Sequence, residues 1–98
     1  MPVRILEIME TARKLKIVNT LGLHARAAGK IVELGKQYKS QLIFQKDGQE
    51  VDGSSILSIL TLACPKGTEM QARIIGDDSE DFMETLSRLF EQRFGEDR

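Results

Sequence analysis

The sequence is short of the residue types that build disulfides, metal centres and membrane spans. Its 98 residues include one cysteine and one histidine. Cys64 has no second cysteine to pair with, so an internal disulfide is excluded and a reducing compartment is expected. The same scarcity leaves too few ligands for a metal site and no partner that would make Cys64 a nucleophile. Since no apolar run approaches the roughly 20 residues of a membrane span, we expect no membrane insertion, and likewise no metal and no cofactor.

The sequence also lacks a strong excess of charge of either sign. Its 14 lysines and arginines stand against 15 aspartates and glutamates, which gives a formal net charge of −1. This balance argues against a protein that binds nucleic acid by broad phosphate neutralisation. Repeats, linkers and low-complexity segments are missing, so the length predicts a single domain. The first residues do not resemble a secretion signal, and we expect a cytoplasmic protein.

Hydrophobic periodicity predicts four strands and three helices. Alternating apolar and polar residues indicate the strands, at residues 13–19, 40–46, 49–52 and 68–75. Apolar residues at helical spacing indicate the helices, at residues 25–38, 56–62 and 77–94. The order β-α-β-β-α-β-α predicts an α/β open-faced sandwich, in which three helices cover one face of a four-stranded antiparallel sheet.

Each end of the predicted sandwich has its own signals. Residues 1–12 form an extension whose apolar residues fit either helical or strand spacing. Asp77 with Glu80 resembles a capping box for the last helix. The polar tail from Gly95 to Arg98 is expected to fray.

One segment places the histidine and an arginine at a helix start. The heptapeptide GLHARAA, residues 22–28, follows the first predicted strand. With His24 as the N-cap, free backbone N–H groups surround any anion on its ring. These N–H groups belong to Ala25, Arg26 and Ala27. A neutral imidazole has one bare nitrogen that can take a phosphoryl group, and imidazole is also a usable leaving group.

These two side chains also have a structural interpretation. His24 could cap the helix or lie on the surface without any chemistry. Arg26 could be a solvated first-turn residue, but a cation there opposes the helix dipole by up to about 1 kcal/mol. A visiting anion would remove this penalty, and Arg26 could grip its oxygens. The pattern therefore favours phosphoryl handling.

A second helix start carries serines and apolar residues. Ser55 is predicted to be the N-cap of the short helix, with Ser54 as the alternative. A phosphate on such a serine would be tolerated, because the helix dipole and free amides favour negative charge. The apolar residues that follow could be core or could form an exposed docking patch near His24. They are Ile56, Leu57 and Leu60.

The two motifs together resemble those of the HPr family, the histidine phosphocarriers of the bacterial phosphoenolpyruvate-dependent sugar phosphotransferase system. The family signature Gly-Leu-His-x-Arg-Pro-Ala is similar to residues 22–28, with Ala27 in place of the proline. A second signature, Lys-Ser-Ile followed by apolar residues, resembles residues 54–62, with Ser54 in place of the lysine.

The resemblance implies a phosphoryl relay. His24 would take a phosphoryl group from Enzyme I on Nδ1 and pass it to IIA-type domains, while Arg26 steadies the group. Ser55 would be the position modified by HPr kinase. The protein would be a carrier with a covalent phosphohistidine, not an enzyme with turnover of its own.

The likeness covers about residues 13–94, which leaves residues 1–12 as an extension before an HPr-like domain at residues 13–98. We expect a monomer. The extension offers one route to a dimer, through exchange of a strand or helix.

Three other functions stay open. The first is a regulatory or nitrogen-branch member of the same family, and the second is a non-covalent ligand-binding module. The third is a small acylphosphatase-like hydrolase, which needs an arginine and an amide that orients water. Asn19 and Arg26 are the only such residues near the turn, and they fit this role poorly.

Overall fold

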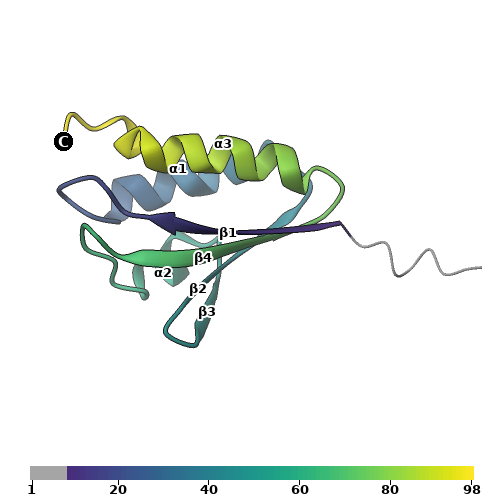
Figure 1. Ribbon diagram of the computed structural model, residues 1–98, viewed down its shortest axis with the longest axis horizontal. Coiled ribbons are helices and arrows are strands. Elements are labelled where there is room, and N and C mark those ends of the chain that lie inside the picture. Colours follow the sequence, from purple (N-terminus) through teal and green to yellow (C-terminus); the bar gives the residue numbers. More distant parts are fainter. Residues whose placement is uncertain (1–8) are drawn as a thin grey trace, which may run out of the picture.

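The computed structural model describes residues 9–98, and these residues alternate between strands and helices as predicted (Figure 1). In chain order the elements are β1 (Glu10–Lys16), α1 (Ala25–Gly35), β2 (Gln41–Lys46), β3 (Gln49–Asp52), α2 (Ile56–Leu60), β4 (Glu69–Ile75), α3 (Ser79–Glu91) and a 3₁₀ turn (Arg93–Gly95). In this part of the chain, no helix has the length and apolar character that crossing a membrane requires.

The strands form one antiparallel sheet in the order β1-β4-β2-β3. β4 is an inner strand, so Ala72 lies opposite Arg13 of β1 on one side and opposite Phe44 of β2 on the other. α1 and α3 lie along one face of the sheet (Figure 1), and α2 contacts α1 and β3. The predicted open-faced sandwich, with one face covered by three helices, is confirmed.

Alternation along the strands decides which face the helices cover. On β4, Met70 and Ile74 are buried while Glu69 and Gln71 are exposed on the other face. The helices close this layer with their apolar stripes, which comprise Ala27, Ala28 and Ile31 of α1 and Phe82, Met83, Leu86 and Phe90 of α3. Full burial of one large apolar side chain contributes about 1.5–3 kcal/mol. This shared core therefore holds α1 and α3 in fixed positions over the sheet.

β1 begins earlier than the sequence pattern indicates. Glu10 pairs with Ile75 and Thr11 with Ile74, so residues 10–12 belong to the strand and not to an extension. The start of β1 is an edge strand whose residues are exposed or half-buried, and this weakens the hydrophobic alternation. Of the rest of the predicted extension, residues 1–8 lie outside the described residues.

α1 ends at Gly35, although the apolar pattern continues to Tyr38. Tyr38 lies in the turn after the helix, where its N–H donates to the Gly35 carbonyl at 3.1 Å. Its ring still stacks on Phe82 with a centroid separation of 4.6 Å. Its hydroxyl is 2.9 Å from the Thr85 hydroxyl. The periodicity therefore identified a core residue correctly but placed it in the wrong element.

The predicted capping box at the start of α3 is wrong. The N-cap is Asp78, and its side chain makes no hydrogen bond to the helix. The carboxylate instead accepts the backbone N–H groups of Lys39 and Ser40, at 2.9 and 3.0 Å, and the Ser40 hydroxyl. The Ser40 hydroxyl, followed by the Lys39 N–H, holds the pKa of Asp78 below its ordinary value. Asp78 thus fastens the turn before β2 to the start of α3.

Asp78→Asn should destabilise the fold at neutral pH, because an amide cannot accept three donors as a carboxylate does. The folded pKa of Asp78 is lowered, so its stabilisation is present above the ordinary aspartate pKa and is lost as the pH falls through the lowered value. Urea unfolding at pH 7 should show a lower midpoint for the variant than for the wild type. The difference between the two midpoints should narrow below about pH 4.

Asp77→Asn is the matched control, since its exposed neighbouring carboxylate makes none of these contacts. An equal loss of stability in both variants would contradict this role for Asp78. So would a difference in urea midpoint between Asp78→Asn and the wild type that persists in acid.

Candidate functional site

His24 is the N-cap of α1, as predicted, with φ −88° and ψ −179°. Its ring Nδ1 accepts the backbone N–H of Arg26 at 3.2 Å. The side chain of His24 is 29% exposed, so a partner protein can reach the ring. The dipole of the helix start gives the surroundings of the ring a positive potential.

The loop after β1 orients His24 through a tight turn at Gly22. Gly22 has φ +75°, and a Cβ atom there would lie 2.8 Å from the Cys64 carbonyl oxygen. Leu23 donates its N–H to the same carbonyl at 2.9 Å. The fully buried Asn19 donates Nδ2 to the Gly22 carbonyl at 2.8 Å. Only glycine fits at position 22, because the turn needs a positive φ and a close backbone approach.

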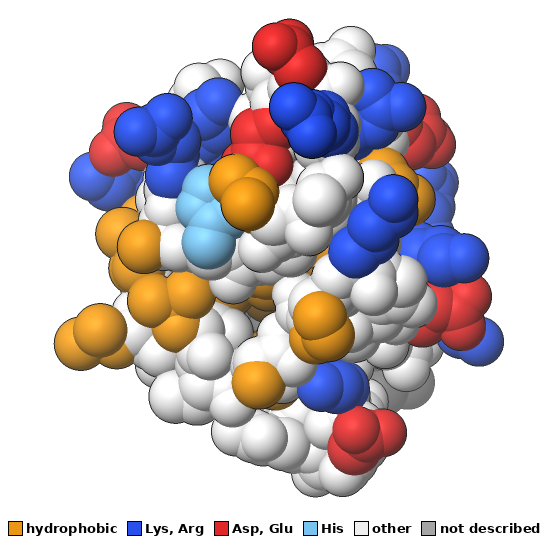
Figure 2. All heavy atoms as spheres, turned by 90° about the vertical axis from the view of Figure 1, so that its left-hand side faces the viewer, with side chains coloured by type: hydrophobic (Ala, Val, Ile, Leu, Met, Phe, Trp, Pro, Cys, Tyr) orange, Lys and Arg blue, Asp and Glu red, His pale blue; other side chains and the backbone are white. Residues whose placement is uncertain are grey.

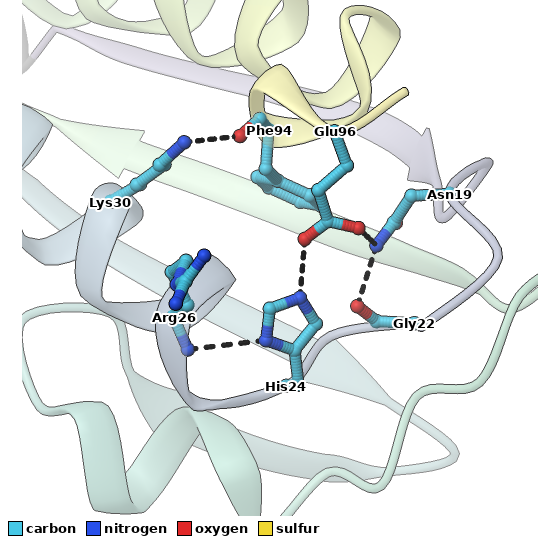
Figure 3. Close-up of polar contacts among 7 residues, drawn as sticks. All are labelled: Asn19, Gly22, His24, Arg26, Lys30, Phe94 and Glu96. Carbon is cyan, nitrogen blue, oxygen red and sulfur yellow. Dashed lines mark hydrogen bonds and ion pairs between the residues drawn. The ribbon is translucent and has the colours of Figure 1, made fainter. Parts of the chain in front are cut away.

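The structure adds a residue that the sequence pattern does not reveal, Glu96. One carboxylate oxygen of Glu96 contacts His24 Nε2, and the other accepts Asn19 Nδ2 at 2.9 Å (Figure 3). Burial acts to raise the pKa of Glu96, but hydrogen bonds from Asn19 and His24, with the electrostatic influence of the basic side chains of His24 and Lys30, outweigh it and lower that pKa. Glu96 and His24 are far apart in the chain, so no local motif could have paired them.

The C-terminal tail is folded against the site, so the expected fraying is wrong. Phe94 is 1% exposed, and its ring packs on Phe90 with a centroid separation of 4.9 Å. Its carbonyl accepts Lys30 Nζ at 2.5 Å, and the Arg98 carbonyl accepts the Thr20 N–H at 3.1 Å. Positive φ angles at Arg93 (58°) and Phe94 (55°) turn the chain back after α3. These bends and the burial of Phe94 outweigh the polar composition of the last four residues.

Arg26 is exposed on the first turn of α1, on the same side as Lys30 (Figure 3). Among residues 9–98 its guanidinium makes no hydrogen bond or ion pair, so it can bind an incoming anion. The backbone N–H groups that were expected to surround an anion on the His24 ring are only partly available. The N–H of Arg26 is occupied by His24 Nδ1, and Ala27 is fully buried.

Ser55, and not the alternative Ser54, is the N-cap of α2. The Ser55 hydroxyl accepts the Ser58 N–H at 3.2 Å. Ser54 instead donates its N–H and its hydroxyl to Asp52, at 2.8 and 2.7 Å, and these bonds lower the pKa of Asp52. A carboxylate therefore occupies the neighbourhood in which the family signature has a lysine.

Apolar side chains lie on the surface next to His24. Figure 2 shows hydrophobic side chains around the pale-blue His24. Among the exposed hydrophobic residues, Leu57 is 78% exposed, Leu21 71% and Ile56 38%. Leu60 is half-buried against the core, so it offers less surface than the other predicted docking residues. Ile56 also lines an open groove of about 720 Å³ between α1 and α3, together with Arg26 and Lys30. In residues 9–98 no three acidic, cysteine or histidine side chains gather as metal ligands would.

Comparison with known proteins identifies the family. A family model described as the phosphotransferase-system HPr component phosphorylation site matches residues 11–92. Phosphocarrier protein HPr of Xylella fastidiosa is 42% identical over 84 residues, which cover 86% of this chain and 94% of that protein. Phosphocarrier protein NPr of Escherichia coli is 30% identical over 90 residues, 91% of this chain and 100% of that one.

A comparison with a solved structure points to the same family. HPr-C-His from Thermoanaerobacter tengcongensis superposes with a TM-score of 0.85 at 33% identity, over 90% of this chain and 99% of that one. The fold and sequence together define a phosphocarrier of the HPr type. The chain belongs to the HPr family.

Gly22→Ala should be more damaging than an alanine at another positive-φ glycine. The left-handed backbone costs an alanine about 1–2 kcal/mol by itself, and at position 22 a Cβ would also press on the Cys64 carbonyl. Gly48→Ala is the control, because Gly48 has φ +82° but a Cβ atom there would meet no other atom within 4 Å. Urea unfolding should show a clearly larger loss of stability for Gly22→Ala. Equal losses in the two variants would mean that the turn accommodates a Cβ atom.

Proposed function

We propose that His24 accepts a phosphoryl group from Enzyme I and passes it to IIA-type domains of the phosphotransferase system. The observation that carries this proposal is the orientation of Nδ1, which faces the start of α1 beside Arg26, whose guanidinium makes no hydrogen bond or ion pair within residues 9–98. The Nδ1 lone pair forms the bond to phosphorus. The bond from phosphorus to the donor breaks, and the donor leaves with the electron pair. In the second step of the relay, the acceptor attacks phosphorus, the bond from phosphorus to Nδ1 breaks, and the imidazole leaves with the electron pair.

The start of α1 supplies a place for the phosphoryl oxygens. When phosphorus bonds to Nδ1, the Arg26 N–H loses its acceptor and becomes free to donate to a phosphoryl oxygen. The guanidinium of the same residue adds a charge-assisted bond. The protein acts as a covalent carrier, and both bond changes on His24 need partner proteins.

Exposed apolar side chains support docking of partner proteins next to His24. Leu57 and Ile56 present apolar surface at the start of α2, and Leu21 is exposed in the loop before His24, where it lines a hollow with Glu96. Apolar residues at the centre of an interface supply much of its binding energy. Ser55 lies at the edge of this surface and is the proposed position for HPr kinase, because a phosphate there would remain at a helix start.

The nitrogen branch of the phosphotransferase system is the second candidate, favoured by the similarity to NPr of Escherichia coli. It needs the same chemistry at His24 and differs in its partners. The hydrolase alternative is disfavoured by the position of Asn19. This side chain is buried, and its amide nitrogen is committed to Gly22 and Glu96, so it cannot orient a water for attack.

His24→Ala should fold and accept no phosphate from Enzyme I and labelled phosphoenolpyruvate. The label on the wild type should be lost in acid and retained in alkali, as expected of phosphohistidine. Ser55→Ala should label normally and serves as the control for a second site. Undiminished labelling of His24→Ala would overturn the proposal.

Arg26→Ala should slow phosphoryl transfer by about tenfold or more, because a hydrogen bond to a charged group contributes roughly 1.5–3 kcal/mol. Its melting temperature should change little, since the side chain is exposed and a cation at a helix start gains nothing from the dipole. Lys14→Ala, which removes a charge from the uncovered face of the sheet, should transfer at the wild-type rate. A large fall in melting temperature with normal transfer would show that Arg26 has a structural role instead.

A further inference from the structure

We propose that Glu96 is a positioning residue that keeps the proton of His24 on Nε2 and leaves Nδ1 bare for phosphoryl transfer. This inference rests on the proposed relay and adds a residue to it. Glu96 does not touch the phosphoryl group, because it contacts the ring nitrogen on the far side from Nδ1 (Figure 3). It acts through the histidine.

The two ring nitrogens have partners of opposite kinds. Nδ1 faces the backbone N–H of Arg26, which can only donate, so Nδ1 must present a lone pair. Nε2 faces a carboxylate oxygen of Glu96, which can only accept when ionised, so Nε2 must carry the proton. Both contacts select the same tautomer of the neutral ring. The bare nitrogen is the one at the helix start, where a phosphoryl group is best stabilised.

The carboxylate of Glu96 is itself held in place. Its second oxygen accepts Asn19 Nδ2 at 2.9 Å, and the same nitrogen donates to the Gly22 carbonyl at 2.8 Å. Asn19 is fully buried, so this link is rigid and shielded from water. Glu96 is therefore tied to the turn that positions His24, and the two groups cannot move independently.

The tail that carries Glu96 is anchored on both sides of it. Before Glu96, Phe94 is buried and its carbonyl accepts Lys30 Nζ. After it, the Arg98 carbonyl accepts the Thr20 N–H at 3.1 Å. A group that is placed in advance gains more from an interaction than one that must first be ordered.

The charge of Glu96 suits both halves of the relay. As Nδ1 gives its electron pair to phosphorus, positive charge develops on the ring, and an adjacent carboxylate stabilises it without taking the proton. A ring that keeps its Nε2 proton is then a good leaving group when the acceptor attacks. Glu96 contacts the ring from the tail, and Arg26 and Lys30 lie on the side of α1 that faces the site. The two cations offset repulsion between the carboxylate and the phosphoryl oxygens.

The test uses the full-length protein and two substitutions of Glu96. Glu96→Gln keeps the size and one acceptor oxygen but removes the charge, whereas Glu96→Ala removes both. Asp97→Asn is the matched control, because it removes the same charge from an exposed neighbour on the same tail. Proton and nitrogen NMR of the unphosphorylated protein reads which ring nitrogen carries the proton and how fast that proton exchanges with water.

In the wild type and Asp97→Asn, the spectra should show a slowly exchanging proton on Nε2 and an unprotonated Nδ1. Glu96→Ala should lose the slow exchange. Transfer from phosphorylated Enzyme I should be slowed about tenfold in Glu96→Gln and at least as much in Glu96→Ala, as for loss of one charge-assisted hydrogen bond. Asp97→Asn should transfer normally.

A wild-type proton on Nδ1, or equal slowing in Glu96→Gln and Asp97→Asn, would overturn the role of Glu96. A wild type that takes no phosphate from Enzyme I would overturn the relay instead. The NMR result alone then decides whether Glu96 positions the ring.

Discussion

The buried amide of Asn19 joins the two chain segments on which the site depends. Its nitrogen holds the carbonyl of Gly22 in the loop after β1 and the carboxylate of Glu96 in the tail after α3. A hydrogen bond to an ionised group is stronger than one between neutral groups, and burial strengthens it further. Through this one side chain, the turn that presents His24 and the group that faces its ring have a fixed relation.

The sandwich serves this arrangement by fixing where the loop and the tail meet. The antiparallel pairing of β1 with β4 and the packing of α3 over the sheet bring the end of β1 and the end of α3 to the same edge of the molecule (Figure 1). The burial of Phe94 then turns the tail inward. The site is thus assembled from the first loop, the start of α1 and the last residues.

Local signals were sufficient for most of the fold and for part of the site. The N-cap positions of His24 and Ser55 follow from residue type and the apolar residues that come after them. The turn at Asp47 and Gly48 adopts positive φ angles, 52° and 82°, which are typical of an Asp-Gly dipeptide in a two-residue hairpin. Contacts between distant segments were not predictable. Glu96 lies in a tail whose polar composition predicts fraying, yet its carboxylate binds His24 and Asn19. Asp78 is the N-cap of α3, yet its carboxylate binds the backbone before β2 instead of its own helix.

The departures from the family signatures are compatible with this arrangement. Ala27 replaces a proline, yet it is buried in the first turn of α1, and the ring of His24 is oriented by other residues. Ser54 replaces a lysine and is bound to Asp52, which changes the charge around Ser55 and leaves its capping bond intact. The substitutions therefore bear more on the proposed regulation at Ser55 than on the proposed phosphoryl transfer at His24.

The most direct test of the central claim is to determine which atom of His24 carries the phosphorus. Protein labelled with nitrogen-15 in its histidine can be phosphorylated with Enzyme I and phosphoenolpyruvate and examined by NMR for coupling between phosphorus and the ring nitrogens. We predict coupling to Nδ1, with the proton kept on Nε2. Coupling to Nε2, or phosphorus on another residue, would contradict the claim.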